Sequence, residues 1–113
     1  MCKSELDLML NNFLQNAKKT FGDKLVDIIL YGSYARGDYD KESDIDVMLL
    51  MDIPSEETDD YIRPVVRIAN EAGWNSDSYI SSNVTSYAHF EKYKEALPFY
   101  KNVINEGVRL IAR

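Results

Sequence analysis

Apolar residues recur along the chain with two different periods. Between Ser4 and Phe21 they return every three or four residues, which places them on one face of a helix. Two later segments, Leu25–Tyr31 and Ile45–Met51, are instead short, rich in branched side chains and almost continuously apolar. That pattern is typical of strands covered on both faces. The chain is therefore predicted to begin with a long helix, followed by two buried strands.

Weaker patterns predict the remaining elements. A second helix is expected from about Ser55 to Ala72, with a kink or a late start at Pro64 because proline lacks the N–H that a helix interior needs. After it we expect a strand at 78–84, a short helix at 86–93, a helix opened by proline at 98–107, and an edge strand at 108–111. Helices and strands alternate without repeats or linkers. The sequence thus predicts an α/β or α+β fold with a small mixed β-sheet flanked by helices.

Composition limits the class of protein. With 113 residues, 45% apolar and 28% charged, residues 1–113 are expected to form a single domain with one core. The net charge of -6 argues against an extended nucleic-acid surface, which would need basic residues to neutralise phosphates. Cys2 is the only cysteine, so no internal disulfide can form. Since no signal peptide or membrane-spanning run is evident, we expect a cytoplasmic protein with no membrane partner.

Two carboxylates stand at the start of the second strand. Asp44 and Asp46 are two residues apart, so in a strand they project from the same face, with Cα atoms about 6.5 to 7 Å apart. Like charges this close to an apolar core repel each other and resist losing water. A divalent cation would relieve both costs, and Mg²⁺ is typically held by one or two carboxylates together with substrate phosphates. The simpler alternative is a solvated turn or cap.

A possible phosphate-binding turn precedes these carboxylates. Gly32 and Ser33 follow the first strand directly, and a glycine lets backbone N–H groups approach an anion without a Cβ in the way. If Ser33 to Arg36 form a helical turn, its hydroxyl and free N–H groups would cradle phosphate, while Gly37 returns the chain toward the aspartates. Triphosphate and metal would then meet in one place.

The stretch GSYARGDYDKESDID, from Gly32 to Asp46, resembles a known signature. Ten residues separate Ser33 from Asp44, as in the G-S-x10-D-x-D signature of the nucleotidyltransferase superfamily typified by DNA polymerase beta. The short chain and the G-S-Y-A-R-G-D form are similar to the minimal nucleotidyltransferases (MNT), small prokaryotic proteins often encoded beside a HEPN-domain partner. Weaker similarity in the order of elements extends over nearly the whole chain.

This resemblance implies a polymerase beta-like palm fold and a specific reaction. The reaction would be Mg²⁺-dependent transfer of NMP, here AMP from ATP, onto a hydroxyl. For the minimal family the acceptor would be a tyrosine of a HEPN-type toxin, and this chain would be the antitoxin. Gly32 and Ser33 would hold the β- and γ-phosphates, and Asp44 and Asp46 would hold two Mg²⁺ ions. Arg36 would contact phosphate or a partner, although an exposed arginine can also be merely solvated.

Two-metal transfer generally needs a third carboxylate on a neighbouring strand, as base or as metal ligand. Asp77 is the only acid of the stretch NSDSYISSNVTS, which contains the predicted third strand, and we assign it this catalytic and metal-binding role; a plain turn residue is the alternative. If Asp77 has no such role, the chain could be a binding module that neutralises its partner by contact. Transfer to a small molecule such as an aminoglycoside is a further alternative. The single histidine, His89, has no companion ligands for a transition metal and is expected to be a surface or partly buried residue.

Overall fold

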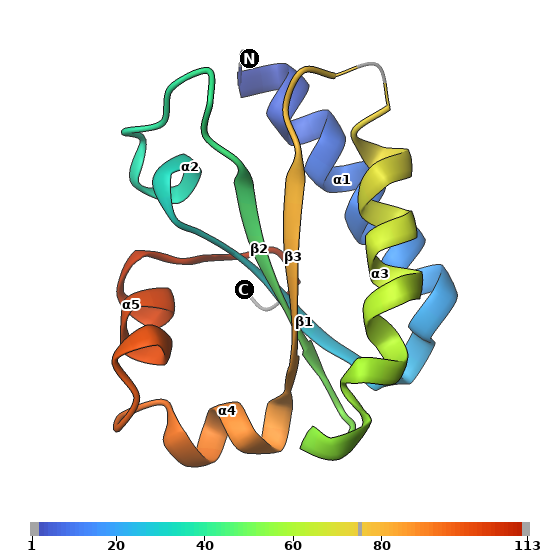
Figure 1. Ribbon diagram of the computed structural model, residues 1–113, viewed down its shortest axis with the longest axis vertical. Coiled ribbons are helices and arrows are strands. Elements are labelled where there is room, and N and C mark those ends of the chain that lie inside the picture. Colours follow the sequence, from blue (N-terminus) through green and yellow to red (C-terminus); the bar gives the residue numbers. More distant parts are fainter. Residues whose placement is uncertain (1–2, 75, 112–113) are drawn as a thin grey trace.

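The computed structural model describes residues 3–74 and 76–111, and Cys2 lies outside these ranges. Figure 1 shows how its helices and strands are arranged. In chain order they are α1 (Lys3–Phe21), a 3-10 turn (Gly22–Lys24), β1 (Leu25–Tyr31), α2 (Ser33–Arg36), β2 (Ile45–Met51), a 3-10 turn (Ser55–Glu57), α3 (Asp59–Ala72), β3 (Ile80–Ser86), α4 (Tyr87–Tyr93), α5 (Pro98–Glu106) and β4 (Val108–Arg109).

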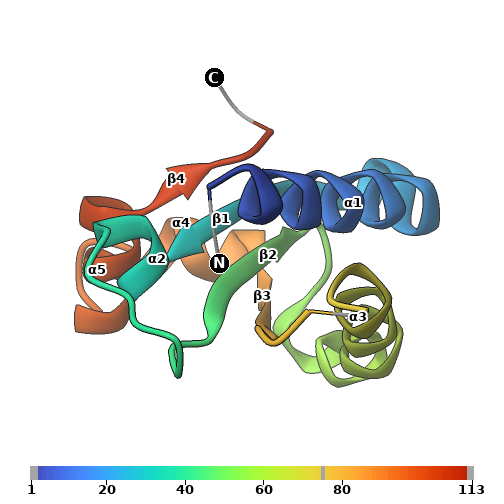
Figure 2. The same cartoon turned by 90° about the horizontal axis from the view of Figure 1, so that it is seen from above.

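The described residues form one four-stranded sheet in the order β3-β2-β1-β4. β1 pairs antiparallel with both β2 and β4, whereas β2 and β3 run parallel, so the sheet is mixed. The helices α1 and α3 cover one face, and α4 and α5 cover the other (Figures 1 and 2). The predicted fold class, a small mixed sheet flanked by helices, is confirmed.

The alternation of side chains along β2 explains both helical layers. Val47 and Leu49 point toward α1 and α3, and Met48 and Leu50 point toward α4 and α5, all with no exposed surface. A strand buried on both faces must be apolar throughout, which is why this segment has no alternating polar residues. By the same period Asp46 lies on the α4 and α5 face, just where the apolar run begins.

The predicted elements agree with the structure except at their boundaries. The third strand was expected at 78–84 but runs from Ile80 to Ser86, because its parallel pairing with β2 sets Ile80 opposite Ile45. The second helix starts late, at Asp59, and runs through Pro64. The edge strand is limited to Val108–Arg109. Among the described residues, no helix combines the length and the apolar character needed to cross a membrane.

A buried aspartate fixes the C-terminal strand to the sheet. Asp27 of β1 is 1% exposed, and its Oδ1 accepts a hydrogen bond of 3.0 Å from the Ile111 N–H. Its Oδ2 lies 2.8 Å from Arg109 Nε of β4 in an ion pair. Buried carboxylates need such partners. Because β4 follows α5 directly, this contact also fixes where α5 ends.

Candidate active site

Gly32 and Asp46 lie against each other where β1 ends and β2 begins. Gly32 has φ 76° and ψ -156°, a conformation that only glycine adopts readily. A Cβ at this position would be 2.5 Å from Asp46 Oδ2 and 3.3 Å from its Cγ. The backbone of the turn therefore lies in direct contact with a candidate metal ligand. Glycine is required here for two separate reasons.

The short helix α2 confirms the predicted turn after Gly32. The N–H groups of Ala35 and Arg36 donate to the Gly32 carbonyl, and the Gly37 N–H donates to the Ser33 carbonyl at 2.8 Å. Gly37 then reverses the chain with φ 88°. The earliest N–H groups of such a turn have no acceptor within it, so they are available to an anion.

The loop from α2 back to β2 is held by its own side chains. The rings of Tyr34 and Tyr39 stack with centroids 4.1 Å apart and an interplanar angle of 9°. Asp40 closes the next turn by accepting from the Glu42 N–H at 2.9 Å, and Ser43 Oγ accepts from the Asp40 N–H at 3.0 Å. The loop thereby places Asp44 at the end of the sheet where α2 lies.

The two predicted aspartates form a poorly compensated pair. Asp44 is exposed and Asp46 is partly buried, between Tyr31 of β1 and Ser81 of β3. Burial raises the pKa of Asp46, and the charge of Asp44 raises it further. Among the described residues, neither carboxylate has a hydrogen bond or an ion pair, although Arg36 lowers the Asp46 pKa at longer range. Paired oxygen ligands with uncompensated charge match the preference of Mg²⁺.

Tyr31, the last residue of β1, lies opposite Asp46 and is affected by its charge. Its pKa is raised by burial and, less strongly, by Asp46. Its ring packs edge to face on Phe99 of α5, with centroids 5.6 Å apart. α5 therefore reaches the carboxylate end of the sheet.

Glu106, at the end of α5, is a site residue that sequence reasoning missed. Its Oε1 accepts from the Gly32 N–H at 3.0 Å, and its Oε2 accepts from Arg36 Nη1 at 2.9 Å. Arg36 Nε also donates to Asp38 at 3.1 Å. One signal could have indicated Glu106: an acid in the last turn of a helix opposes the helix dipole and calls for a compensating partner.

Asp77 is not brought to the aspartate pair. It is exposed, on a bend that precedes β3. The β3 side of the pair is occupied instead by Tyr79, whose carbonyl accepts from the Ile45 N–H at 2.8 Å, and by Ser81, which lies opposite Asp46. Within residues 3–74 and 76–111, no three histidine, cysteine or acidic side chains converge on one possible metal position. The catalytic role of Asp77 stays a prediction.

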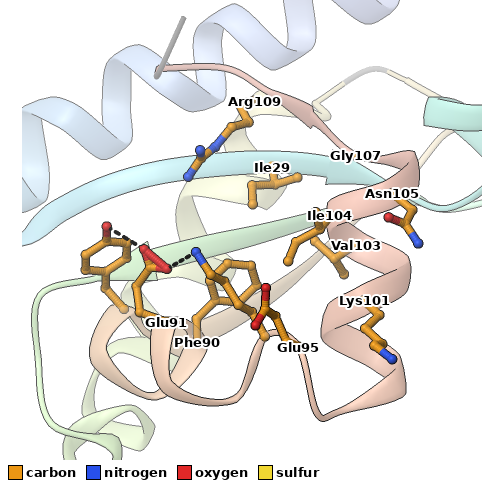
Figure 3. A pocket seen from close by; sticks show the side chains of 12 residues that line it. Ile29, Phe90, Glu91, Glu95, Lys101, Val103, Ile104, Asn105, Gly107 and Arg109 are labelled. Atoms are coloured by element: carbon orange, nitrogen blue, oxygen red, sulfur yellow. Dashed lines mark hydrogen bonds and ion pairs between the residues drawn. The ribbon is translucent and has the colours of Figure 1, made fainter.

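Two cavities lie on the α4 and α5 face of the sheet. The larger, about 620 Å³, lies between α4, α5 and the β1–β4 edge, with Ile29, Phe90 and Val103 in its wall (Figure 3). The smaller, about 320 Å³, has Asn83 and Thr85 of β3 among its lining residues. Neither of these two cavities is lined by Asp44 or Asp46.

His89 is partly buried, as expected, and it contacts a side chain of α5. Its Nδ1 is 2.8 Å from the Tyr100 hydroxyl, and the two rings pack edge to face. Tyr100 is 8% exposed, and burial raises the pKa of its hydroxyl. The pair joins α4 to α5, away from the aspartates.

Sequence comparison relates the chain to one family over nearly its whole length. The family model described as “Nucleotidyltransferase domain” matches residues 10–110. “Putative protein adenylyltransferase MJ0141” of Methanocaldococcus jannaschii is 32% identical over 109 residues, which cover 94% of this chain and 99% of the relative. “Putative protein adenylyltransferase MJ0604” of the same organism is 34% identical over 98 residues, covering 87% of this chain and 90% of the relative.

Solved structures show the same fold at low identity. A mutant of the toxin-antitoxin MntA-HpeT is similar with a TM-score of 0.54 and 19% identity, over 92% of this chain and 72% of that chain. A toxin-antitoxin crystal structure with AMP-PNP has a TM-score of 0.53 and 19% identity, over 90% of this chain and 73% of that chain. These similarities concern the arrangement of helices and strands.

Proposed function

The chain belongs to the nucleotidyltransferase family, and from that premise we propose that it transfers AMP from ATP to a hydroxyl of a partner protein. One observation carries the proposal: the Gly32 turn and the Asp46 carboxylate lie so close that a Cβ on Gly32 would be 2.5 Å from Asp46 Oδ2. A phosphate on the turn and a cation on the aspartates would therefore be in contact. Triphosphate–metal chemistry needs that arrangement.

The donor set fits Mg²⁺. Asp44 and Asp46 offer carboxylate oxygens close to each other, and the pKa of Asp46 is raised by burial and by the charge of Asp44. Two Mg²⁺ ions held there would polarise the α-phosphate, activate the attacking hydroxyl and screen the pyrophosphate that leaves.

The remaining roles follow from the positions of the chain's own groups. The Gly32 N–H and the hydroxyl of Ser33 would donate to the β- and γ-phosphate oxygens as charge-assisted hydrogen bonds. Arg36 would add a positive charge beside them. In the free chain its Nε donates to Asp38 and its Nη1 donates to Glu106, so the guanidinium already binds anionic oxygens. Together they hold the leaving pyrophosphate while the acceptor oxygen bonds to the α-phosphorus.

A protein acceptor suits the openness of the site. Asp44 is exposed, and neither of the two cavities on the α4 and α5 face is lined by Asp44 or Asp46. Two relatives are named as protein adenylyltransferases, and structural neighbours are titled toxin-antitoxin. These names support a toxin as the acceptor, with a tyrosine of a HEPN-type partner as our specific proposal.

The test is a transfer assay. The chain is incubated with the product of the neighbouring gene, ATP and Mg²⁺, and that partner is analysed by intact-mass and peptide mass spectrometry. We expect a mass gain of one AMP on a tyrosine, lost when EDTA replaces Mg²⁺ and lost in the double variant Asp44→Asn, Asp46→Asn. An intact partner that gains no mass with the wild-type chain would refute the proposal.

A second candidate, neutralisation by binding alone, is favoured by one observation. Ser81 and Tyr79, and no acid, occupy the β3 positions beside the aspartate pair. If the Asp44→Asn, Asp46→Asn variant still suppresses the partner's activity as fully as the wild type, contact alone is sufficient.

Asp77 is tested separately. Because its side chain is exposed, Asp77→Asn should leave the free energy of unfolding within about 0.5 kcal/mol of the wild type. A loss of AMP transfer of about a hundredfold or more in this folded variant would support Asp77 as the third carboxylate. Unchanged transfer would leave it as a turn residue.

A further inference from the structure

We propose that Glu106 is an internal competitor for the triphosphate: its carboxylate occupies the phosphate-binding groups of the Gly32 turn in the free chain and leaves them when nucleotide binds. The inference rests on the proposed function, because it takes the Gly32 N–H and Arg36 as the groups that hold phosphate. It makes Glu106 a positioning residue that determines how readily ATP enters.

The contacts of Glu106 are those that a phosphate would make. One carboxylate oxygen accepts from a backbone N–H, that of Gly32, at 3.0 Å, and the other accepts from the Arg36 guanidinium at 2.9 Å. A phosphate group on a glycine turn is held by the same two kinds of donor. The carboxylate and the phosphate cannot use these donors at the same time, so one must displace the other.

The backbone that carries Glu106 is fixed, which restricts how it can leave. A Cβ on the next residue, Gly107, would come within 2.5 Å of Ile29 Cγ2, so the chain there packs tightly on β1. β4 then pairs with β1 immediately, Val108 with Leu30 and Arg109 with Ile29. Release must therefore be a rotation of the Glu106 side chain, without movement of α5.

The local charges favour such an exchange. Glu106 is 22% exposed and Arg36 is 46% exposed, so both can regain water when their contact opens. Glu106 also adds negative charge near Asp46, since it contributes to raising the Asp46 pKa. In the free chain the Glu106 carboxylate holds the turn in its binding shape, at the cost of competing with the incoming anion.

The experiment measures affinity, independently of transfer activity. Binding of ATP and of inorganic tripolyphosphate, each with Mg²⁺, is measured by calorimetry for the wild type, Glu106→Gln and Asp38→Asn. The amide has no charge and only one acceptor oxygen, so it cannot accept from the Gly32 N–H and Arg36 together; Glu106→Gln should therefore bind both ligands about tenfold more tightly, or about 1.4 kcal/mol. Asp38→Asn is the matched control: it also removes one charge paired to Arg36 but leaves the Gly32 N–H contact intact. We expect its affinity to change by less than about threefold.

The outcomes separate this inference from the proposed function. If the wild type binds the ligands and Glu106→Gln binds them with equal or lower affinity, the competitor role is overturned. The nucleotide site itself is then still supported. An equal gain in Asp38→Asn also overturns it, because a general charge effect then accounts for the gain. If neither the wild type nor Glu106→Gln binds either ligand, the nucleotide site itself is refuted.

A measurement on the wild type avoids dependence on any variant. In the ¹³C-labelled chain, saturation with ATP and Mg²⁺ should move the Glu106 carboxylate resonance to the position of a solvated glutamate. A carboxylate resonance that stays unchanged at saturation would overturn the inference.

Discussion

Gly32→Ala should damage both stability and nucleotide binding, for reasons that can be separated. An alanine at φ 76° and ψ -156° costs about 1–3 kcal/mol in backbone strain. Its Cβ would also stand 2.5 Å from Asp46 Oδ2, so the carboxylate must move. We expect the free energy of unfolding to fall by about 3 kcal/mol, which lowers the Tm of a domain of this size by roughly 10 °C.

Gly37→Ala provides the control for strain. Gly37 also has positive φ, 88°, but a Cβ there would have no atom within 4 Å. It should therefore cost only the backbone term, about 1–2 kcal/mol. Urea unfolding measures the free energy of unfolding of both variants. Calorimetry with ATP and Mg²⁺ should show that Gly32→Ala binds ATP at least about tenfold more weakly, whereas Gly37→Ala nearly retains the wild-type affinity.

A double-mutant cycle with Asp46→Ala isolates the contact. If the Cβ displaces the carboxylate, Gly32→Ala should cost about 1 kcal/mol less once Asp46 is already alanine. Equal destabilisation by Gly32→Ala and Gly37→Ala, together with no coupling to Asp46, would refute the argument that this turn and this carboxylate form one site.

Three further substitutions test the charges and contacts around the site. In the folded chain burial and the charge of Asp44 raise the Asp46 pKa, so the stability that protonated Asp46 contributes at low pH is lost as pH rises through that pKa. At neutral pH Asp46→Asn should therefore stabilise the cation-free chain by less than about 1 kcal/mol. The same substitution should abolish any Tm gain from Mg²⁺. An unchanged or lower Tm without Mg²⁺ would contradict this. Asp27→Ala removes the buried partner of Arg109 and should cost about 2–4 kcal/mol in urea unfolding, whereas a cost under about 0.5 kcal/mol would mean that this anchor is dispensable. Tyr100→Phe leaves His89 Nδ1 without its 2.8 Å partner and should cost about 1 kcal/mol by the same assay; no measurable loss would show that water replaces the hydroxyl.

Local sequence determined the first half of the fold and the centre of the candidate site. β1, α2 and β2 have the predicted bounds because a buried strand needs a continuous apolar run and a turn of positive φ needs glycine. The proximity of Asp44 and Asp46, seen in the effect of the Asp44 charge on the Asp46 pKa, follows from their spacing of two residues. These features depend on residues that are close in the sequence, so they can be read from it.

Tertiary packing decided what surrounds that centre. The register of β3 is set by its pairing with β2, and it places Ser81 beside Asp46 and leaves Asp77 on an exposed bend. Glu106 meets Gly32 across 74 residues of chain, a contact that no local pattern encodes. It exists because α5 packs on the sheet face that carries Asp46 and because β4 fixes the end of α5 against β1. The sequence by itself predicts which groups would bind phosphate and metal, whereas only the packed chain brings the Glu106 side chain onto the Gly32 N–H and Arg36.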